Sequence, residues 1–328
     1  MKLVLGVDGG NTKTLALVAR EDGRILGAGR AGCGDIYGAT SPTAAIAEIE
    51  RAVQAALREA KIAPGQISVG AFSLAGADWP EDFQLLEEAM RARGYGQQIV
   101  VVNDALGALR AGSPDGTGVV VACGTGAAVG ARGRDGRIWH SSFWQQTQGA
   151  DELSKRALRA VYHAELGIDP PTLLTQRLLA IFDLQSVEEL LHQLTARDMP
   201  RSEKRRQLVR PLFDCADAGD AVARQILLSH GRALGHYAIV AARNVGLLDG
   251  NFPLILTGGV LRHPSPFLRE SLIACVREAA PGMRAMQSRF EPAAGAVLLA
   301  LDILSIQTEA ALLEQLEKTF PEAAFFAT

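Results

Sequence analysis

The stretch from Lys2 to Leu26 reads KLVLGVDGGNTKTLALVAREDGRIL and decides the fold. It contains an apolar run, a glycine turn, a second apolar run, an Asp-Gly turn and a last short apolar segment. The same pattern recurs from Thr117 to Trp139, as TGVVVACGTGAAVGARGRDGRIW. Apolar runs of this kind suit buried strands, and Asp-Gly is a strong hairpin turn. Each copy therefore predicts a β-meander of three strands.

The two copies align at a constant offset along the sequence. The tetrapeptide Asp22–Ile25 recurs as Asp135–Ile138, an offset of 113 residues (135 minus 22). Two unrelated meanders that share a common turn are the alternative explanation. The strands, the glycine turn and the hairpin all repeat in order, however, and each copy opens a segment long enough for a domain. An internal duplication is therefore the prediction.

Length and composition favour a globular protein of two domains. The chain has 328 residues, of which 48% are hydrophobic and 21% charged. Its net charge of −3 argues against nucleic-acid and anionic-membrane partners. No apolar run reaches membrane-spanning length, and the N-terminal one is too short for a signal peptide. The densest basic run, residues 201–206, is expected on a solvated helix face.

The cysteines are scattered and lack the spacing of a zinc site. They are Cys33, Cys123, Cys215 and Cys275. Free and mostly buried thiols fit a reducing compartment, so the sequence predicts a cytoplasmic protein.

The rest of the chain alternates between helix and strand patterns, which predicts α/β domains with ligands at the carboxyl ends of strands. Further strands are expected at Ile67–Leu74, Ile99–Val102 and Pro253–Leu256. Helices are expected from Pro42, at Glu81–Arg93, over most of Asp151–Leu247, and at Ala293–Ile306 and Ala310–Lys318. The packing of the last helix is left open.

Glycine turns follow three of the apolar strands, at residues 8–13, 123–126 and 257–260. Glycine lets backbone N–H groups approach a phosphate closely, so two facing hairpins with glycine tips would grip one polyphosphate from both sides. The chain has no GxxxxGK[ST] motif and no GxGxxG that opens a helix after the first strand. A P-loop is therefore excluded, and a dinucleotide-binding domain is disfavoured.

Asp8 is the predicted metal residue. A carboxylate at the end of a buried strand is costly unless it is paired or bound to a cation, and the repeat places Val121 at the equivalent position. Mg²⁺ binds through one or two carboxylates together with water and substrate phosphates. The alternative is an Asp that caps its own glycine turn. Thr12 and Lys13 would add a hydroxyl and a charge to the phosphates, although Lys13 also fits an exposed strand position.

Asp104 follows the strand Ile99–Val102 and allows two interpretations. It would act as a general base that takes a proton from an attacking hydroxyl. Alternatively, Asn103 or Asp104 serves as the N-cap of the helix that begins at Ala105. The segment Ser73–Asp78 likewise lines the cleft or simply forms a turn.

Six motifs occur in the order of a known family: Asp8–Lys13, Asn103–Ala105, Cys123–Gly126, Asp217–Arg224, Thr257–Val260 and Pro292–Ala296. Together they resemble the BadF/BadG/BcrA/BcrD-type ATPase family, over about residues 2–305. That family sits in the actin, sugar kinase and Hsp70 superfamily and includes N-acetylglucosamine kinases.

The resemblance implies an α/β fold of two ribonuclease-H-like, actin-like ATPase domains around a central cleft that holds ATP and Mg²⁺. The first domain would comprise residues 1–115 and about 294–328, and the second residues 116–293 with a helical insertion. It also implies a homodimer. Phosphate binding falls to Gly9, Gly10, Asn11, Thr12, Lys13, Gly124, Thr125 and Gly126, adenosine binding to Gly258 and Gly259, and base catalysis to Asp104.

The acceptor side departs from the family's amino-sugar kinases. Their Asn after the first hairpin is replaced here by a loop that contains Asp35. Their Trp-Gly-x-x-x-Gly-Asp-Glu-Gly-Ser segment reads WQQTQGADEL from Trp144, so its Asp position is Ala150 unless a one-residue shift places Asp151 there. The expected substrate contacts are Asp35, Gly76, Trp144 and Asp151. These departures disfavour N-acetylglucosamine itself and leave a different amino sugar or another polyol as the acceptor.

Three functions follow from these observations. The leading hypothesis is ATP-dependent phosphorylation of a sugar or amino sugar, with Asp104 as the base. The alternative is an ATPase switch that couples domain closure to a protein partner without sugar transfer. A non-catalytic sensor is the third, and intact Asp8 and Asp104 weigh against it. Cys123 lacks a matching second iron–sulfur ligand, so a buried structural thiol is predicted there.

Overall fold

The computed structural model describes residues 1–197 and 207–326, and the basic run at 201–206 lies outside them. The described part forms two five-stranded sheets. The first contains, in spatial order, β3 (Ile25–Ala31), β2 (Thr14–Arg20), β1 (Leu3–Gly9), β4 (Val69–Leu74) and β5 (Gln98–Asn103). The second contains β8 (Ile138–His140), β7 (Ala127–Arg132), β6 (Gly118–Cys123), β9 (Phe252–Thr257) and β10 (Met283–Gln287).

The two sheets share one topology, which confirms the predicted pair of meanders. In each sheet the first strand of the meander lies antiparallel to the second and parallel to a later strand. The second and third strands of each meander are also antiparallel, and the sheet ends in a parallel edge pair. The repeat in the sequence is therefore a repeat of fold.

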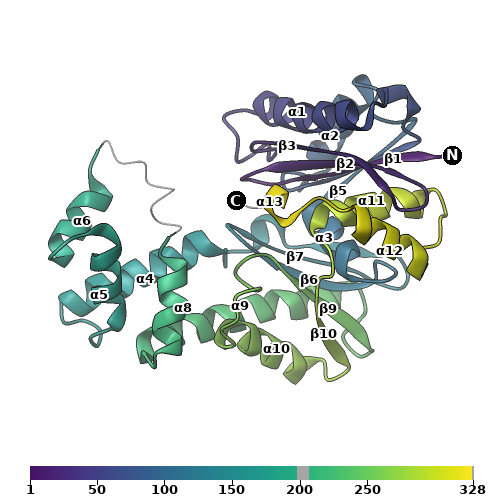
Figure 1. The fold of residues 1–328 in the computed structure, drawn as a ribbon. Helices are drawn as coiled ribbons and strands as arrows, with labels where there is room; N and C mark the ends of the chain where they lie inside the picture. The colour runs from purple at the N-terminus through teal and green to yellow at the C-terminus, as the bar shows by residue number, and fades with distance from the viewer. Residues whose placement is uncertain (198–206, 327–328) are drawn as a thin grey trace.

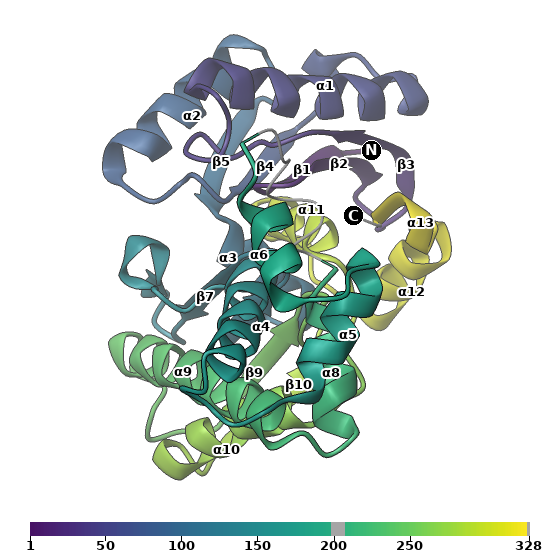
Figure 2. The same cartoon turned by 90° about the vertical axis from the view of Figure 1, so that its left-hand side faces the viewer.

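The helices are divided unequally between the two halves of the chain. The first half contains α1 (Pro42–Ala60), α2 (Pro80–Ala92) and α3 (Asp104–Gly112). The second half contains α4 (Ala150–Glu165), α5 (Leu173–Phe182), α6 (Val187–Thr195), α8 (Val209–Asp217), α9 (Ala221–Asn244), α10 (Phe267–Ala279) and α11 (Pro292–Ile303). We call the first sheet with α1 and α2 the first lobe, and the second sheet with α4–α10 the second lobe. In Figure 1 the helices α4, α5 and α6 extend away from the sheets, and Figure 2 views this extension from its end.

The helices α3 and α11 lie between the two sheets (Figure 1). Ala105, Ala108 and Leu109 of α3 pack against Val120 and Ile255 of the second sheet. The other helix, α11, packs on the first sheet, in a cluster that also holds strand residues of β1 and β2. Each inner helix thus covers the sheet nearest to it, and the crossing of the two helices is one of the contacts that join the lobes.

The C-terminal helices complete the first lobe. Helix α12 (Ala310–Thr319) buries Leu312 and Leu316 in the same cluster as α11 and the face of the first meander that α11 covers. This places the amphipathic helix whose packing the sequence left open. A short helix, α13 (Ala323–Phe326), follows and buries Phe326. No helix in the described ranges is long and apolar enough to cross a membrane.

The crossing of α3 and α11 depends on two glycines. A Cβ on Gly295 would lie 1.8 Å from the Gly107 carbonyl oxygen, which no backbone tolerates without a shift. We expect Gly295→Ala to lower the free energy of unfolding by about 3 kcal/mol, the upper range for overpacking a core. Thermal unfolding measures this. The control is Gly65→Ala, because a Cβ there meets nothing within 4 Å. Equal melting temperatures for the two variants would contradict the predicted crossing.

Candidate active site

A cavity of about 690 Å³ opens between the two meanders. The predicted residues that line it are Asp8, Gly10, Asn11, Thr12, Lys13, Asp35, Asp104, Gly124, Thr125, Gly126, Gly258 and Gly259. They come from the carboxyl ends of strands in both sheets and from the turns that follow. The fold therefore gathers residues up to 251 positions apart (8 to 259) around one space.

The first glycine turn closes on itself and anchors the next loop. The N–H of Gly10 donates to the Lys13 carbonyl oxygen at 2.9 Å, and the N–H of Gly34 donates to the Gly10 carbonyl oxygen at 3.0 Å. This second bond holds Asp35 at the cavity wall beside Asn11. The glycine turn at residues 8–13 and the loop that carries Asp35 are thus linked directly by a backbone hydrogen bond.

The second and third glycine turns lie side by side. The N–H of Val260 donates to the Cys123 carbonyl oxygen at 3.0 Å. Gly258 has φ of +93°, and a Cβ there would lie 2.3 Å from that same oxygen. Glycine is required at this position both by the backbone conformation and by the close approach.

The two hairpins face each other through equivalent residues. The Thr12 hydroxyl donates to the Thr125 hydroxyl at 3.4 Å, and these residues are separated by the 113-residue offset of the repeat. Both threonines line the cavity. A pair of related turns that meet at their tips is the geometry expected for holding one polyphosphate from both sides.

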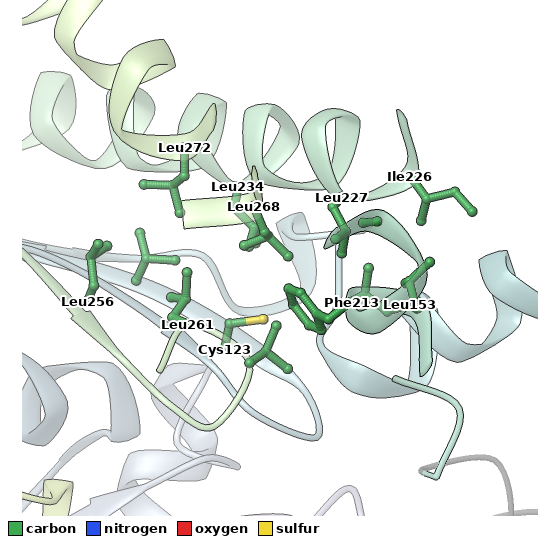
Figure 3. Close-up of a cluster of buried hydrophobic side chains, with 14 of the residues drawn as sticks. Cys123, Leu153, Phe213, Ile226, Leu227, Leu234, Leu256, Leu261, Leu268 and Leu272 are labelled. Atoms are coloured by element: carbon green, nitrogen blue, oxygen red, sulfur yellow. The ribbon is translucent and has the colours of Figure 1, made fainter. Parts of the chain in front are cut away.

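The Cys123 side chain belongs to the protein core. Its residue is fully buried, and Figure 3 shows its sulfur among apolar side chains that include Phe213 and Leu261. Burial raises the pKa of this thiol to about 12, so it stays protonated at neutral pH. No group of three or more metal-ligating side chains occurs among the described residues. The prediction of a structural thiol is confirmed.

Asp8 and Asp104 are half-buried carboxyls at the ends of β1 and β5. Burial, then the charge of Asp104, raises the pKa of Asp8 to about 7, with Lys13 opposing this rise. Burial, then the charge of Asp78, raises the pKa of Asp104 to about 7 as well. Because ionising either carboxyl in this acidic cavity is unfavourable, both are suited to bind a cation or to accept a proton.

The residue that caps α3 is Asn103. Its side-chain oxygen accepts the N–H of Ala105 at 3.1 Å. Asp104 is the first residue of the helix, and its carboxylate lines the cavity. The Asp104 carboxylate also accepts the backbone N–H groups of Ala105 and of Asp104 itself, so the two residues share the cap, and only Asp104 presents its carboxylate to the cavity.

Cationic side chains also line the cavity. The Lys13 ammonium donates to the carbonyl oxygen of Phe326 in α13, and burial lowers the pKa of this lysine. Arg262, which follows the third glycine turn, forms an ion pair with Glu291. Sequence reasoning missed Arg262 and Glu291, although Arg262 lies only two residues beyond a glycine turn that it had singled out.

Four predicted residues are absent from the described cavity wall. Gly9 is buried within β1, and Gly76 is buried against Ile36, next to Asp35. Asp151 is exposed in the first turn of α4, and Trp144 is 73% exposed. Phe143 lines the cavity instead of Trp144, so this arrangement does not support the predicted stacking of Trp144 on a sugar.

The donor atoms around Asp8 fit a magnesium ion. The cavity wall offers carboxylate oxygens, which Mg²⁺ prefers. Burial and the nearby acids disfavour the negative charge of Asp8, and a bound cation would offset that cost. No ready-made cluster of three or more ligands is present in the described residues. Mg²⁺ in general takes one or two protein carboxylates and completes its shell with water and phosphate.

Comparison with known proteins gives a family and two curated relatives. The model of the BadF/BadG/BcrA/BcrD ATPase family matches residues 5–300. An N-acetylmuramic acid/N-acetylglucosamine kinase from Clostridium acetobutylicum is 26% identical, covering 92% of this chain and 98% of the relative. An N-acetyl-D-glucosamine kinase from Dictyostelium discoideum is 28% identical over the same shares.

A solved structure shares the fold. The crystal structure of a protein described as a putative N-acetylglucosamine kinase, from Chromobacterium violaceum, superposes with a TM-score of 0.67 at 22% identity. The match covers 92% of this chain and 99% of that one. The predicted actin-like architecture with two related sheets is therefore confirmed.

Proposed function

The chain belongs to the BadF/BadG/BcrA/BcrD ATPase family, and from that premise we propose that it transfers the γ-phosphoryl group of ATP to a sugar or amino sugar. One observation carries the proposal. The cavity between the facing glycine turns contains, just after β5, the carboxylate of Asp104, while the neighbouring Asn103 is the N-cap of the helix. Phosphoryl transfer to a hydroxyl needs a phosphate-binding site and a base in the same cavity.

In the proposed mechanism the glycine turns bind the phosphates through backbone N–H groups, and Thr12 and Thr125 add hydroxyl donors from opposite sides. Lys13 and Arg262 balance phosphate charge from the cavity wall. Asp104 accepts the proton of the sugar hydroxyl as that oxygen attacks the γ-phosphate. Exclusion of water from the closed cleft limits hydrolysis of ATP.

Asp8 would hold the magnesium ion, directly or through water. The ion neutralises phosphate charge when it is bound, which favours the transfer. The residues of this chain then bind, orient and deprotonate the acceptor. Asp35 and Phe143, which both line the cavity, replace Gly76, Trp144 and Asp151 as its expected contacts in this conformation.

We propose that the domain division follows residues 1–115 with about 294–328, and 116–293. The separate buried clusters of the two lobes support this, with α3 and α11 crossing between them. A homodimer and a cytoplasmic location complete the proposal. The free cysteines in the described chain fit a reducing compartment.

The proposed reaction is tested by identifying its product. We expect the purified protein, given Mg²⁺ and ATP, to convert N-acetylglucosamine, N-acetylmuramic acid, glucosamine or glucose into a phosphate ester. Mass spectrometry and phosphorus NMR detect that ester and locate the phosphorylated oxygen. Formation of inorganic phosphate alone, with every sugar unchanged, would instead indicate the ATPase switch.

A further inference from the structure

A chain of hydrogen bonds joins the second lobe to the helix that carries Asp104. The Ser142 hydroxyl, after β8, donates to Oδ1 of Asp78 at 2.6 Å. The same Asp78 oxygen accepts the side-chain N–H of Asn103 at 3.0 Å. Asn103 in turn caps α3 by accepting the N–H of Ala105. We call Ser142, Asp78 and Asn103 the cross-lobe relay.

The Ser142 end of the relay is held in an unusual conformation. Ser142 has φ of +40°, a region that non-glycine residues rarely adopt. Nδ1 of His140 is bonded to the Ser142 hydroxyl oxygen. Because that hydroxyl gives its hydrogen to Asp78, the imidazole must be the donor, and burial, which lowers the pKa of His140, keeps the ring neutral. The backbone thus bears strain that aims the hydroxyl at the other lobe.

The same loop makes an aromatic contact across the cleft. The ring of Phe143 meets Tyr37 edge-on at 5.0 Å and stacks on Trp79 at 6.0 Å, both on the first lobe. Tyr37 also donates to the Asp82 carboxylate at 3.1 Å, and that carboxylate accepts the N–H of Trp79. The loop that carries Ser142 therefore packs against Tyr37 and Trp79 of the first lobe, both of which are held in place by Asp82.

The first-lobe end of the relay is rigid. Asn103 is 3% exposed, and its side-chain N–H groups bond to Asp78 and to the Ala77 carbonyl oxygen. Turning this amide would remove the cap of α3 and move Asp104, the first residue of that helix. Asp78 thus fixes which atom of Asn103 faces the helix.

We propose that the cross-lobe relay positions the Asp104 carboxylate when the lobes are closed, so that the base is aligned only while the acceptor pocket is sealed. The inference rests on the proposed kinase function. The bond from Ser142 to Asp78 exists only where the lobes meet, whereas the bonds from Asp78 to Asn103 lie within the first lobe. Separation of the lobes therefore removes one of the two partners that hold Oδ1 of Asp78. Ser142 and Asp78 are positioning residues in this account, and Asp104 alone touches the acceptor hydroxyl.

The test is a double-mutant cycle on sugar phosphorylation with Ser142→Gly and Asp78→Ala. Glycine removes the hydroxyl and tolerates the positive φ, so the loop keeps its path. We expect each single variant to lower kcat about 10- to 100-fold, since a misplaced catalytic group costs up to about 10²-fold. The affinity for ATP and the KM for the sugar should change less than about threefold. The double variant should be no slower than the slower single variant, because both changes break one relay.

Three outcomes would overturn the relay. The first is a kcat for Ser142→Gly within about twofold of the wild type, and the second is losses that multiply in the double variant. The third is a raised sugar KM at unchanged kcat in Asp78→Ala, which would make Asp78 a direct substrate contact. Asp78→Ala affects a more buried network, so thermal unfolding of both variants is measured. If Asp78→Ala does not fold, the result for Ser142→Gly alone decides the test. If the wild type itself phosphorylates no sugar, the proposed function fails and the relay with it. If the wild type is active and only the cycle fails, the kinase assignment stands.

Discussion

Replacing Asp104 by asparagine is expected to lower kcat for sugar phosphorylation by about 10²–10⁴-fold while ATP still binds. The amide keeps the shape of the side chain but cannot accept the proton of the acceptor hydroxyl. Since Asn103 supplies the cap of α3, the helix and the stability of the protein should be preserved. Coupled kinetics give kcat, and calorimetry gives the affinity for ATP. Asp249→Asn, an exposed loop substitution, is the matched control.

The dependence of the wild-type rate on pH gives a second measure of the same group. Burial raises the pKa of Asp104 from 3.8 to about 7, so the carboxyl is protonated and inactive below that pH. The value of kcat/KM should therefore fall at least tenfold for each pH unit on the acid side of 7, and more steeply where Asp8, whose pKa is also about 7, is protonated as well. A rate that stays constant down to pH 5, or an Asp104→Asn variant with a near wild-type rate, would remove Asp104 from the base role.

Replacing Asp8 by asparagine is expected to lower the Mg²⁺-dependent rate by about 10²–10³-fold, since a bound cation contributes several kcal/mol to charge neutralisation. The defect should appear as a much higher Mg²⁺ concentration needed for half-maximal rate. A magnesium titration at saturating ATP measures it, with Asp249→Asn again as the control. An unchanged magnesium dependence would favour the alternative in which Asp8 only caps its own turn.

The stability of the Asp8→Asn variant separates these two roles further. The folded state raises the pKa of Asp8 from 3.8 to about 7, so it binds a proton more tightly than the unfolded chain does. Stability contributed by this group is therefore lost as pH rises from about 4 to about 7, and asparagine removes that loss. A residue that serves only as a turn cap would lower the melting temperature when replaced. We expect the variant to unfold at an equal or higher temperature than the wild type above pH 7.

The fold was largely predictable because its decisive features are local. Two meanders, their Asp-Gly hairpins and the 113-residue offset all appear within short stretches, and the structure confirms them as matching sheets. The placement of α12 was not predictable. Its Leu312 and Leu316 meet strands nearly 300 residues earlier in the chain, and a periodic apolar stripe does not identify its partner.

The site was predictable where it follows strand ends. Each glycine turn comes directly after an apolar strand, so topology alone gathers the turns at one cavity. The choice between Asn103 and Asp104 as the cap could not be made from spacing, because either residue suits that position. The hydrogen bond from the Ala105 N–H decides it.

The acceptor side was harder to predict because it depends on local backbone conformation and on contacts between the lobes. Phe143 and Trp144 are adjacent aromatics, and the sequence does not tell which ring faces the cavity. Phe143 lines the cavity, although its residue is 49% exposed, whereas Trp144 is 73% exposed and lies outside the lining. Similarly, the bond between Ser142 and Asp78 joins residues 64 positions apart and has no sequence signature.

The most direct test of the account is release of ADP from Mg²⁺-ATP against a panel of sugars and amino sugars, with a control that lacks an acceptor. The account predicts slow release without acceptor and strong stimulation by at least one member of the panel, lost in Asp104→Asn. Steady release of ADP that ignores every sugar would contradict it and favour an ATPase that couples closure to a protein partner.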